Sequence, residues 1–224
     1  MNLASSSWLI LQMADSAFPM GGFGHSGGLE AAWQHREVRN KNDLVFFLKA
    51  ALMQTQRGAL PFVKAAHQRE EALPDLDRLC DAFISNHVAN RASRAQGQAW
   101  LASAERSFGG ETLNALMTVV RDEELPGHLA TLFGSVTAGL EIQLPETVRL
   151  FVFTQLRGLV SAAVRLGIVG PLEAQRIQHS LMPLADQTSA NPEELRLDEI
   201  AQTAPLLDLY QGTQDRLYSR LFQS

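Results

Sequence analysis

The stretch from residue 13 to residue 30, which reads MADSAFPMGGFGHSGGLE, limits how this chain can fold more than any other stretch. It follows an apolar segment and precedes a helix-like run, LEAAWQ. Glycine adopts backbone conformations that strain other residues, and it lets a second surface approach the main chain closely. The stretch therefore predicts a tight turn that serves as a ligand cradle, a catalytic turn or a close-packed contact. The turn-forming residues are Pro19, Gly21, Gly22, Gly24, Ser26, Gly27 and Gly28.

Two short motifs known from enzymes occur inside this turn. Residues 22–27 satisfy G-x-G-x-x-G, the dinucleotide-binding pattern, which requires a strand running directly into the first glycine. Pro19 and Asp15 interrupt that approach, and no alternation of strands and helices follows. Residues 24–28 satisfy G-x-S-x-G, the nucleophile elbow of hydrolases, but too few residues precede Ser26 to build the sheet that the elbow needs. A serine hydrolase using Ser26 is kept only as an alternative.

Apolar residues elsewhere recur at helical spacing. Alanine and leucine outnumber the β-branched residues and aromatic residues make up 7% of the chain, which favours helices over strands. Leu44, Phe47 and Leu48 begin one apolar stripe, and residues 148–164 hold the longest one. Glycine and proline pairs separate such stripes. The sequence therefore predicts an all-α fold, a single-domain bundle of about eight to ten helices.

The composition changes at residue 186. The stretch QTSANPEELRLDEIAQTAP is polar and holds two prolines, which is typical of a linker. We expect residues 1–185 to form the all-α core, and residues 186–224 to form a polar linker and a C-terminal tail helix that packs on the core or on a partner. In that helix Tyr218, Leu221 and Phe222 would share one face, because they are three and four residues apart.

The charge and the single cysteine exclude several classes of protein. A net charge of −5 argues against a general affinity for nucleic acid or for an anionic membrane. No apolar run approaches the ~18 residues of a membrane-spanning helix. Cys80 is the only cysteine, so an internal disulfide and a multi-cysteine zinc site are excluded. With an N-terminus unlike a signal peptide, these features predict a cytoplasmic protein that binds neither nucleic acid nor membrane.

Residues for metal or nucleotide chemistry do not form recognisable groups. No two of the six histidines are four residues apart, none belongs to a Glu-x-x-His pair, and no Walker motif occurs. We expect no metal site and no cofactor. His25 is the exception worth testing, because it lies in the glycine turn and a symmetric oligomer could bring two copies together around a metal ion.

A polar helix is predicted around Arg91 and Arg94. Two interpretations stay open: a helix satisfied by internal hydrogen bonds, or a docking face, because the planar arginine fork pairs bidentately with carboxylates. Ser93, Gln96 and Gly97 belong to the same segment.

Two further patterns lie on later helices. Arg157 and Arg165 are eight residues apart, on one side of the longest predicted helix, and we expect Arg165 to have an acidic partner. Gly134, Ala138 and Gly139 would let two helices approach closely, either across a homodimer seam or within one chain.

Four segments of the chain resemble segments of a single known protein family. They are ADSAFP with GGFGHS and GLE between residues 14 and 30, RASRAQG at 91–97, AAVRLG with Gly170-Pro171 from residue 162, and LYSRLFQS at 217–224. In this order, and over nearly the whole chain, they resemble the urease accessory protein UreF. Gln214-Asp215 departs from the His-acid pair expected of the family, which affects details of the tail contact.

The resemblance implies a non-enzymatic, homodimeric factor for urease maturation. Such a factor bridges the scaffold UreD, also called UreH, and the GTPase UreG, and helps to load nickel into apo-urease; its tail orders against UreD. A direct nickel-binding carrier is the other alternative. The predicted partner-binding residues are Asp15, Pro19, Gly22, Phe23, His25, Ser26, Glu30, Arg91, Ser93, Arg94, Gln96, Gly97, Tyr218, Arg220, Leu221, Phe222 and Ser224.

Overall fold

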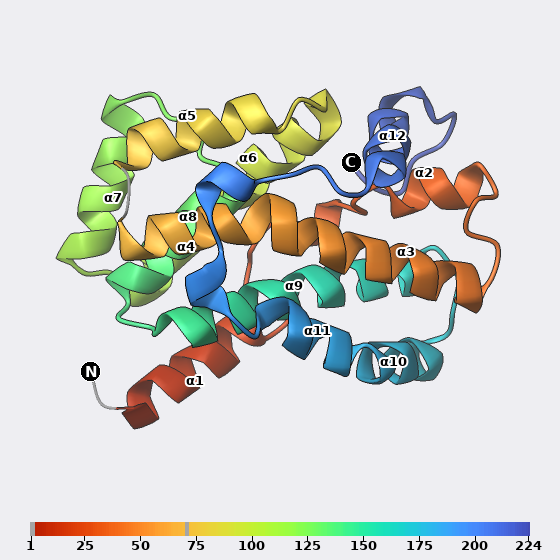
Figure 1. Ribbon diagram of the computed structural model, residues 1–224, viewed down its shortest axis with the longest axis horizontal. Coiled ribbons are helices and arrows are strands. Elements are labelled where there is room, and N and C mark those ends of the chain that lie inside the picture. Colours follow the sequence, from red (N-terminus) through yellow and green to blue (C-terminus); the bar gives the residue numbers. More distant parts are fainter. Residues whose placement is uncertain (1–2, 70–71) are drawn as a thin grey trace.

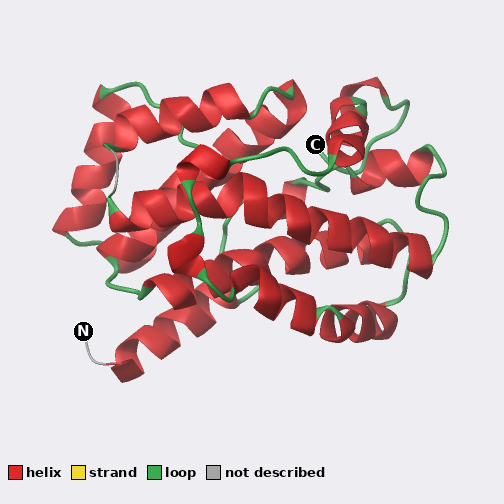
Figure 2. Ribbon diagram, in the orientation of Figure 1, coloured by secondary structure: helices red, strands yellow, loops and turns green. Residues whose placement is uncertain are grey.

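The computed structural model describes residues 3–69 and 72–224, and within these residues the chain is helical without a strand (Figures 1 and 2). This confirms the predicted all-α fold. The α-helices are α1 (Leu3–Ala14), α2 (Leu29–Gln34), α3 (Lys41–Gln54), α4 (Leu60–Gln68), α5 (Leu73–Phe83), α6 (His87–Phe108), α7 (Glu111–Asp122), α8 (Leu129–Gly139), α9 (Leu144–Arg165), α10 (Pro171–Ser180), α11 (Met182–Ser189) and α12 (Pro205–Gly212).

These helices outnumber the eight to ten predicted, because short helices divide segments that the sequence pattern left whole. α10 and α11 meet at Leu181, and Pro183 in the first turn of α11 has no N–H to continue α10. α2 ends at Gln34, and Arg36 then takes a left-handed backbone conformation with φ 62°.

The core lies where α4, α6, α8 and α9 meet, with α9 running through the middle of the molecule (Figure 1). Trp100 of α6 stacks on Phe133 of α8 with ring centroids 4.7 Å apart, and Phe133 meets Phe151 of α9 edge-on at 5.0 Å. Offset and edge-to-face rings at such distances are favourable arrangements, so the three helices are joined by one aromatic column.

α8 packs tightly on α4 at Gly134. A Cβ atom at this position would lie 2.2 Å from the carbonyl oxygen of Val63, which only glycine avoids. Of the two interpretations of the small residues in α8, Gly134 therefore supports close packing within one chain, and it is not available for a homodimer seam.

α9 is long and apolar enough, by length and composition, to cross a membrane, and it is the helix of the described residues with that property. The sequence analysis expected no apolar run near the length of a membrane-spanning helix, and α9 shows that this expectation was wrong. The rest of the protein buries 56% of its apolar window, because α9 packs against α3, α4, α8, α10 and α11.

Residues 190–204, which we call the strap, cross the outside of α4 and the end of α3 (Figure 1). The strap was predicted as a linker, and it is held by specific contacts. The Nζ atom of Lys64 donates to the carbonyl of Leu195 at 3.0 Å. Between α3 and α4 the chain forms a π-helical turn, and the carbonyl of Arg57 in this turn accepts from the N–H of Ala201 at 3.2 Å.

The last residues differ from the predicted tail helix. The terminal helix is α12, and after a short 3-10 turn the chain from residue 217 to residue 224 is irregular. Tyr218 is fully exposed whereas Phe222 is 3% exposed. The shared helical face of Tyr218, Leu221 and Phe222 is therefore a wrong prediction.

Candidate functional site

The glycine turn is a close contact between distant parts of the chain. Gly21, Gly27 and Gly28 have φ of 75°, 58° and 85°, in the left-handed region that glycine enters without strain. A Cβ atom on Gly28 would lie 3.1 Å from the backbone nitrogen of Gln211 in α12. Of the three interpretations of the turn, the geometry within the chain therefore favours the close-packed contact.

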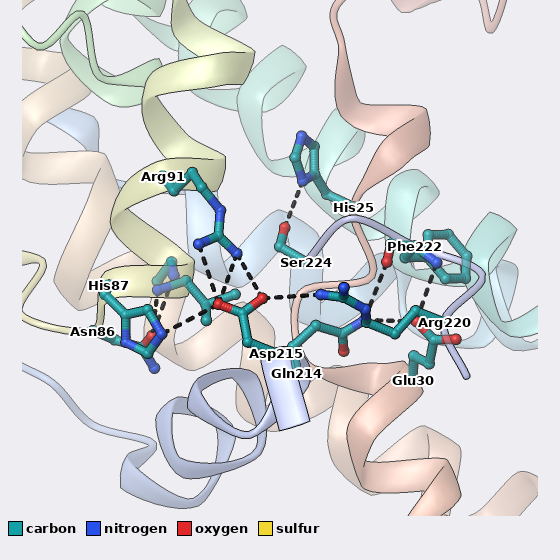
Figure 3. A network of polar contacts seen from close by, with 12 residues as sticks. His25, Glu30, Asn86, His87, Arg91, Gln214, Asp215, Arg220, Phe222 and Ser224 are labelled. Atoms are coloured by element: carbon teal, nitrogen blue, oxygen red, sulfur yellow. Dashed lines mark hydrogen bonds and ion pairs between the residues drawn. The ribbon is translucent and has the colours of Figure 1, made fainter. Parts of the chain in front are cut away.

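The tail lies along this turn and hydrogen-bonds to its backbone. The N–H of Gln223 donates to the carbonyl of Gly24 at 2.8 Å, and the N–H of Ser26 donates to the carbonyl of Ser224 at 2.5 Å. The Nδ1 atom of His25 also shares a hydrogen bond of 2.5 Å with the hydroxyl of Ser224 (Figure 3). The turn and the tail, nearly the whole chain apart in sequence, thus form one surface.

Glu30, at the start of α2, is the anchor of the tail. Its side chain is 2% exposed and accepts hydrogen bonds from the N–H of Leu221 at 2.6 Å and from the N–H of Phe222 at 3.1 Å (Figure 3). The Nε2 atom of Gln214 donates a third, at 2.6 Å. A buried carboxylate is tolerated only when such donors satisfy it. Glu30 was predicted to contact a partner, and the structure places it inside the chain.

Arg165 joins the turn and the tail through aromatic rings. Its guanidinium lies 3.7 Å from the ring centroid of Phe23 and 4.2 Å from that of Phe222, and it donates to the carbonyl of Phe23. The guanidinium is attracted to the negative face of each ring, and arginine makes such cation–π contacts more often than lysine does. Among the described residues no carboxylate forms an ion pair with Arg165, so the predicted acidic partner was wrong.

Arg91 of α6 holds the far end of the tail. Its guanidinium forms a bidentate pair with Asp215 at 2.9 and 3.2 Å, and Arg220 and His87 contact the same carboxylate at 3.1 and 3.4 Å (Figure 3). Arg91 is the main reason why the pKa of Asp215 lies below its usual value. Sequence reasoning noted Asp215 only as a departure from the family, because nothing local to it indicates a partner in α6.

Some residues in the polar segment of α6 are satisfied inside the chain, and others are exposed as a docking face would require. Ser93 accepts at its hydroxyl from the N–H of Leu129 at 3.2 Å, and Gly97 is buried, since a Cβ atom there would lie 2.2 Å from the carbonyl of Gly127. Gln96 is half-buried beside Gly22. Arg94 is exposed, and so is half of the Arg91 side chain.

Asp15 and Pro19 lie at the exposed entrance to the turn. The carboxylate of Asp15 accepts from the N–H of Ala17 at 2.7 Å, and the carbonyl of Pro19 accepts from the hydroxyl of Ser103 at 2.7 Å. These contacts fix the path of the chain from α1 into the turn.

A cleft of about 900 Å³ opens beside the turn and runs along α9. It is lined mainly by apolar groups, among them Phe23, Leu159 and Leu172, together with the glutamines 155 and 175. A cleft of this size and lining is suited to a segment of another protein or to an apolar ligand.

Comparison with known proteins identifies the family. The UreF family profile matches residues 38–182. Urease accessory protein F of Arabidopsis thaliana is 37% identical over 233 residues, covering 100% of this chain and 96% of the relative. Urease accessory protein F of Oryza sativa subsp. japonica is 36% identical over 221 residues, covering 97% and 85%. The chain belongs to the UreF family. It is also 29% identical to a UreF-like protein of Schizosaccharomyces pombe, over 96% of both chains.

The two enzymatic motifs of the turn have no matching geometry in this UreF-family chain. Ser26 is fully buried, and its hydroxyl accepts from the N–H of Glu30 in the first turn of α2 at 3.4 Å. The nucleophile elbow and the dinucleotide motif both need a strand before the turn, whereas α1 precedes it and the described residues contain no strand.

The UreF-family chain also has a buried polar cluster that sequence reasoning missed. Asp77 of α5 is fully buried and accepts from the N–H groups of Gly127 and His128 at 2.7 and 2.9 Å and from the hydroxyl of Thr131 at 2.5 Å. His128 contacts Asp81 at 3.0 Å. The cluster fixes the start of α8. Its only sequence signal is an aspartate on the apolar face of α5, beside Leu76 and Cys80.

Proposed function

We propose that this chain is a non-enzymatic urease maturation factor that bridges UreD, also called UreH, and the GTPase UreG while nickel is loaded into apo-urease. The observation that carries the proposal is the similarity to urease accessory protein F of Arabidopsis thaliana over the whole of this chain. The junction of turn and tail supports it, because that junction presents contact groups rather than a reaction centre.

The exposed side chains at this junction are of the types that dominate protein interfaces. Phe23 is 73% exposed, Tyr218 is fully exposed and Leu221 is 53% exposed, with Arg220 beside them. Tyrosine and arginine are enriched among residues that contribute most to binding. We propose that this surface meets UreD, and that the factor acts as a homodimer in the cytosol.

The bridging role is tested by mixing the purified chain with UreD and UreG and measuring complex mass by light scattering. The measurement is repeated with and without GTP and nickel. We expect a complex that contains all three proteins and that increases the activation of apo-urease by nickel. Failure of the chain to associate with either protein under all these conditions would disprove the bridging role.

The tail assignment is tested by deleting residues 218–224. We expect the deletion to abolish co-purification with UreD, because it removes Tyr218 and Leu221 from the surface. The helical content by circular dichroism serves as the control for folding. Full recovery of UreD with the truncated chain would show that the tail is not the contact.

The nickel-carrier alternative and the hydrolase alternative make different predictions. A carrier using His25 would bind nickel at micromolar concentration in isolation and lose it in His25→Ala. A hydrolase would turn over esters and lose that activity in Ser26→Ala. For a bridging factor we expect neither result, and isothermal titration with nickel and an ester hydrolysis assay measure them directly.

A further inference from the structure

We propose that the cleft along α9 binds a free amphipathic carboxylate, a small molecule with one carboxylate and a long alkyl chain, such as a fatty acid. The alkyl chain lies in the cleft between α9 and α10, and the guanidinium of Arg157 holds the carboxylate. This binding site is separate from the bridging role, so either one can fail without the other.

The cleft has the volume and the walls that an alkyl chain needs. Its volume of about 900 Å³ is within the usual range for sites that bind small molecules. α10 packs beside α9, and a Cβ atom on Gly158 in the wall of the cleft would meet nothing within 4 Å (Figure 1). Both walls are helices, whose backbone groups already pair within the helix. An extended peptide would leave its own backbone groups without partners there, whereas an alkyl chain has none to satisfy.

Two arginines of α9 bring positive charge to the cleft. Arg157 and Arg165 both line it, and among the described residues no carboxylate lies within ion-pair distance of either. Each donates to one backbone carbonyl, that of Ala14 or of Phe23, although a guanidinium has five N–H donors. Burial lowers the pKa of Arg157 by more than the charge of Asp15 raises it. A carboxylate in the cleft would supply the acceptor that Arg157 lacks.

A buried amide without a partner lies on the α10 side of the cleft. Gln178 is 7% exposed and lines the cleft, and its side chain makes no hydrogen bond within the described part of the chain. Buried polar groups are normally paired, so this amide is available to the polar group of a ligand. The described residues of the lining include one carboxylate, Asp208 of α12, against the two arginines. The lining therefore favours an anion over a cation.

The chemistry of the ligand is tested by isothermal titration of the full chain with decanoate, octanoate and decan-1-ol. We expect decanoate to bind, and octanoate to bind about tenfold more weakly because it buries two fewer methylene groups. Decan-1-ol should bind at least about tenfold more weakly than decanoate, because it has the same alkyl chain without the charge. Absence of decanoate binding would overturn the site, and equal affinity for the alcohol would overturn the role of the carboxylate.

The location of the site is tested with Gly158→Leu, with Gly170→Leu as the matched control. A Cβ atom at either glycine would meet nothing within 4 Å, but Gly158 lines the cleft and Gly170 does not. We expect Gly158→Leu to weaken decanoate binding by more than about tenfold, because the leucine side chain fills the space of the alkyl chain. Gly170→Leu should bind as the unchanged chain does, and circular dichroism checks that both variants fold. Full decanoate affinity in Gly158→Leu would show that the ligand binds elsewhere.

The role of the cation is tested with Arg157→Gln. We expect this variant to bind decanoate about tenfold more weakly and to keep its affinity for decan-1-ol, since only the carboxylate contact is lost. Arg149→Gln, at an exposed position of α9 outside the cleft, is the control and should change neither affinity. Equal losses for the acid and the alcohol would show that Arg157 shapes the cleft and does not hold the carboxylate.

The outcomes also separate this site from the bridging role and from a contact between copies of the chain. If decanoate binds and the chain associates with neither UreD nor UreG, the bridging role alone fails. If decanoate does not bind, and Gly158→Leu lowers the mass of the free chain in light scattering, the cleft is a contact between copies and the ligand site is overturned.

Discussion

Single residues predicted to contact partners divide into two sets in the structure. Glu30, Ser26 and Ser224 face the interior and hold the turn and the tail together. Phe23 and Tyr218 face outward. The sequence marked both sets alike, because residue type alone does not distinguish a buried hydrogen-bonding group from an exposed one.

His25 makes the turn and tail sensitive to pH. Its pKa is lowered, first by burial and then by the charge of Arg91. As the pH falls below about 6.5, the unfolded chain therefore binds a proton before the folded chain does. The contribution of neutral His25 to the free energy of unfolding should be fully present above that pH. It should decline as the pH falls toward the lower pKa of folded His25. Urea unfolding at a series of pH values from about 8 to about 5 measures this decline.

His25→Asn is the control for this pH dependence. It removes the titrating group, so part of the decline between pH 8 and 5 should disappear. An identical decline in the variant would show that other groups cause it.

At the scale of helices, the closest approaches occur at glycines. Gly97 brings α6 to the start of α8, and Gly134 brings α8 to α4. Gly158 of α9 differs, because a Cβ atom there would meet nothing within 4 Å. The glycines that set helix spacing can therefore be separated by experiment from one that does not.

We expect Gly97→Ala and Gly134→Ala each to lower the free energy of unfolding by about 2 kcal/mol or more, because each methyl group would lie 2.2 Å from a carbonyl oxygen. Gly158→Ala should instead raise it by up to about 1 kcal/mol, because alanine favours the helix and has room. Urea unfolding measures all three. A Gly134→Ala chain as stable as the unchanged chain would contradict the packing of α8 on α4.

The strap depends on Gln54 at the end of α3. The Oε1 atom of Gln54 accepts from the N–H groups of Thr203 and Ala204 at 2.6 and 3.0 Å, and its Nε2 atom donates to Gln202 at 2.8 Å. Gln54→Ala should speed hydrogen exchange at residues 202–204 and lower the free energy of unfolding by about 1–2 kcal/mol, since two backbone donors lose their partner. Gln68→Ala, which removes only an exposed contact with Glu193, is the control and should change neither measurement appreciably.

For the whole molecule, the tail contributes to folding through its hydrogen bonds to Glu30. Truncation after Thr213 removes the three hydrogen-bond donors of Glu30 and should lower the free energy of unfolding by about 2 kcal/mol or more. Glu30→Gln should destabilise the full chain, yet it should change the truncated chain much less, because the three donors that favour the carboxylate are already absent there. Thermal unfolding of the four proteins measures this difference, and an equal effect in both chains would show that Glu30 does not act through the tail.

The sequence by itself determined that the chain is helical, roughly where most helices lie, and to which family it belongs. Apolar spacing and glycine or proline breaks act within a few residues, so they are visible in the sequence. The tertiary structure decided which residues meet. Glu30 and Leu221, which share a hydrogen bond, are 191 positions apart in the sequence. Arg165 contacts the rings of Phe23 and Phe222, whereas the sequence analysis expected a carboxylate. No local pattern encodes such contacts, because they depend on how all the helices pack together.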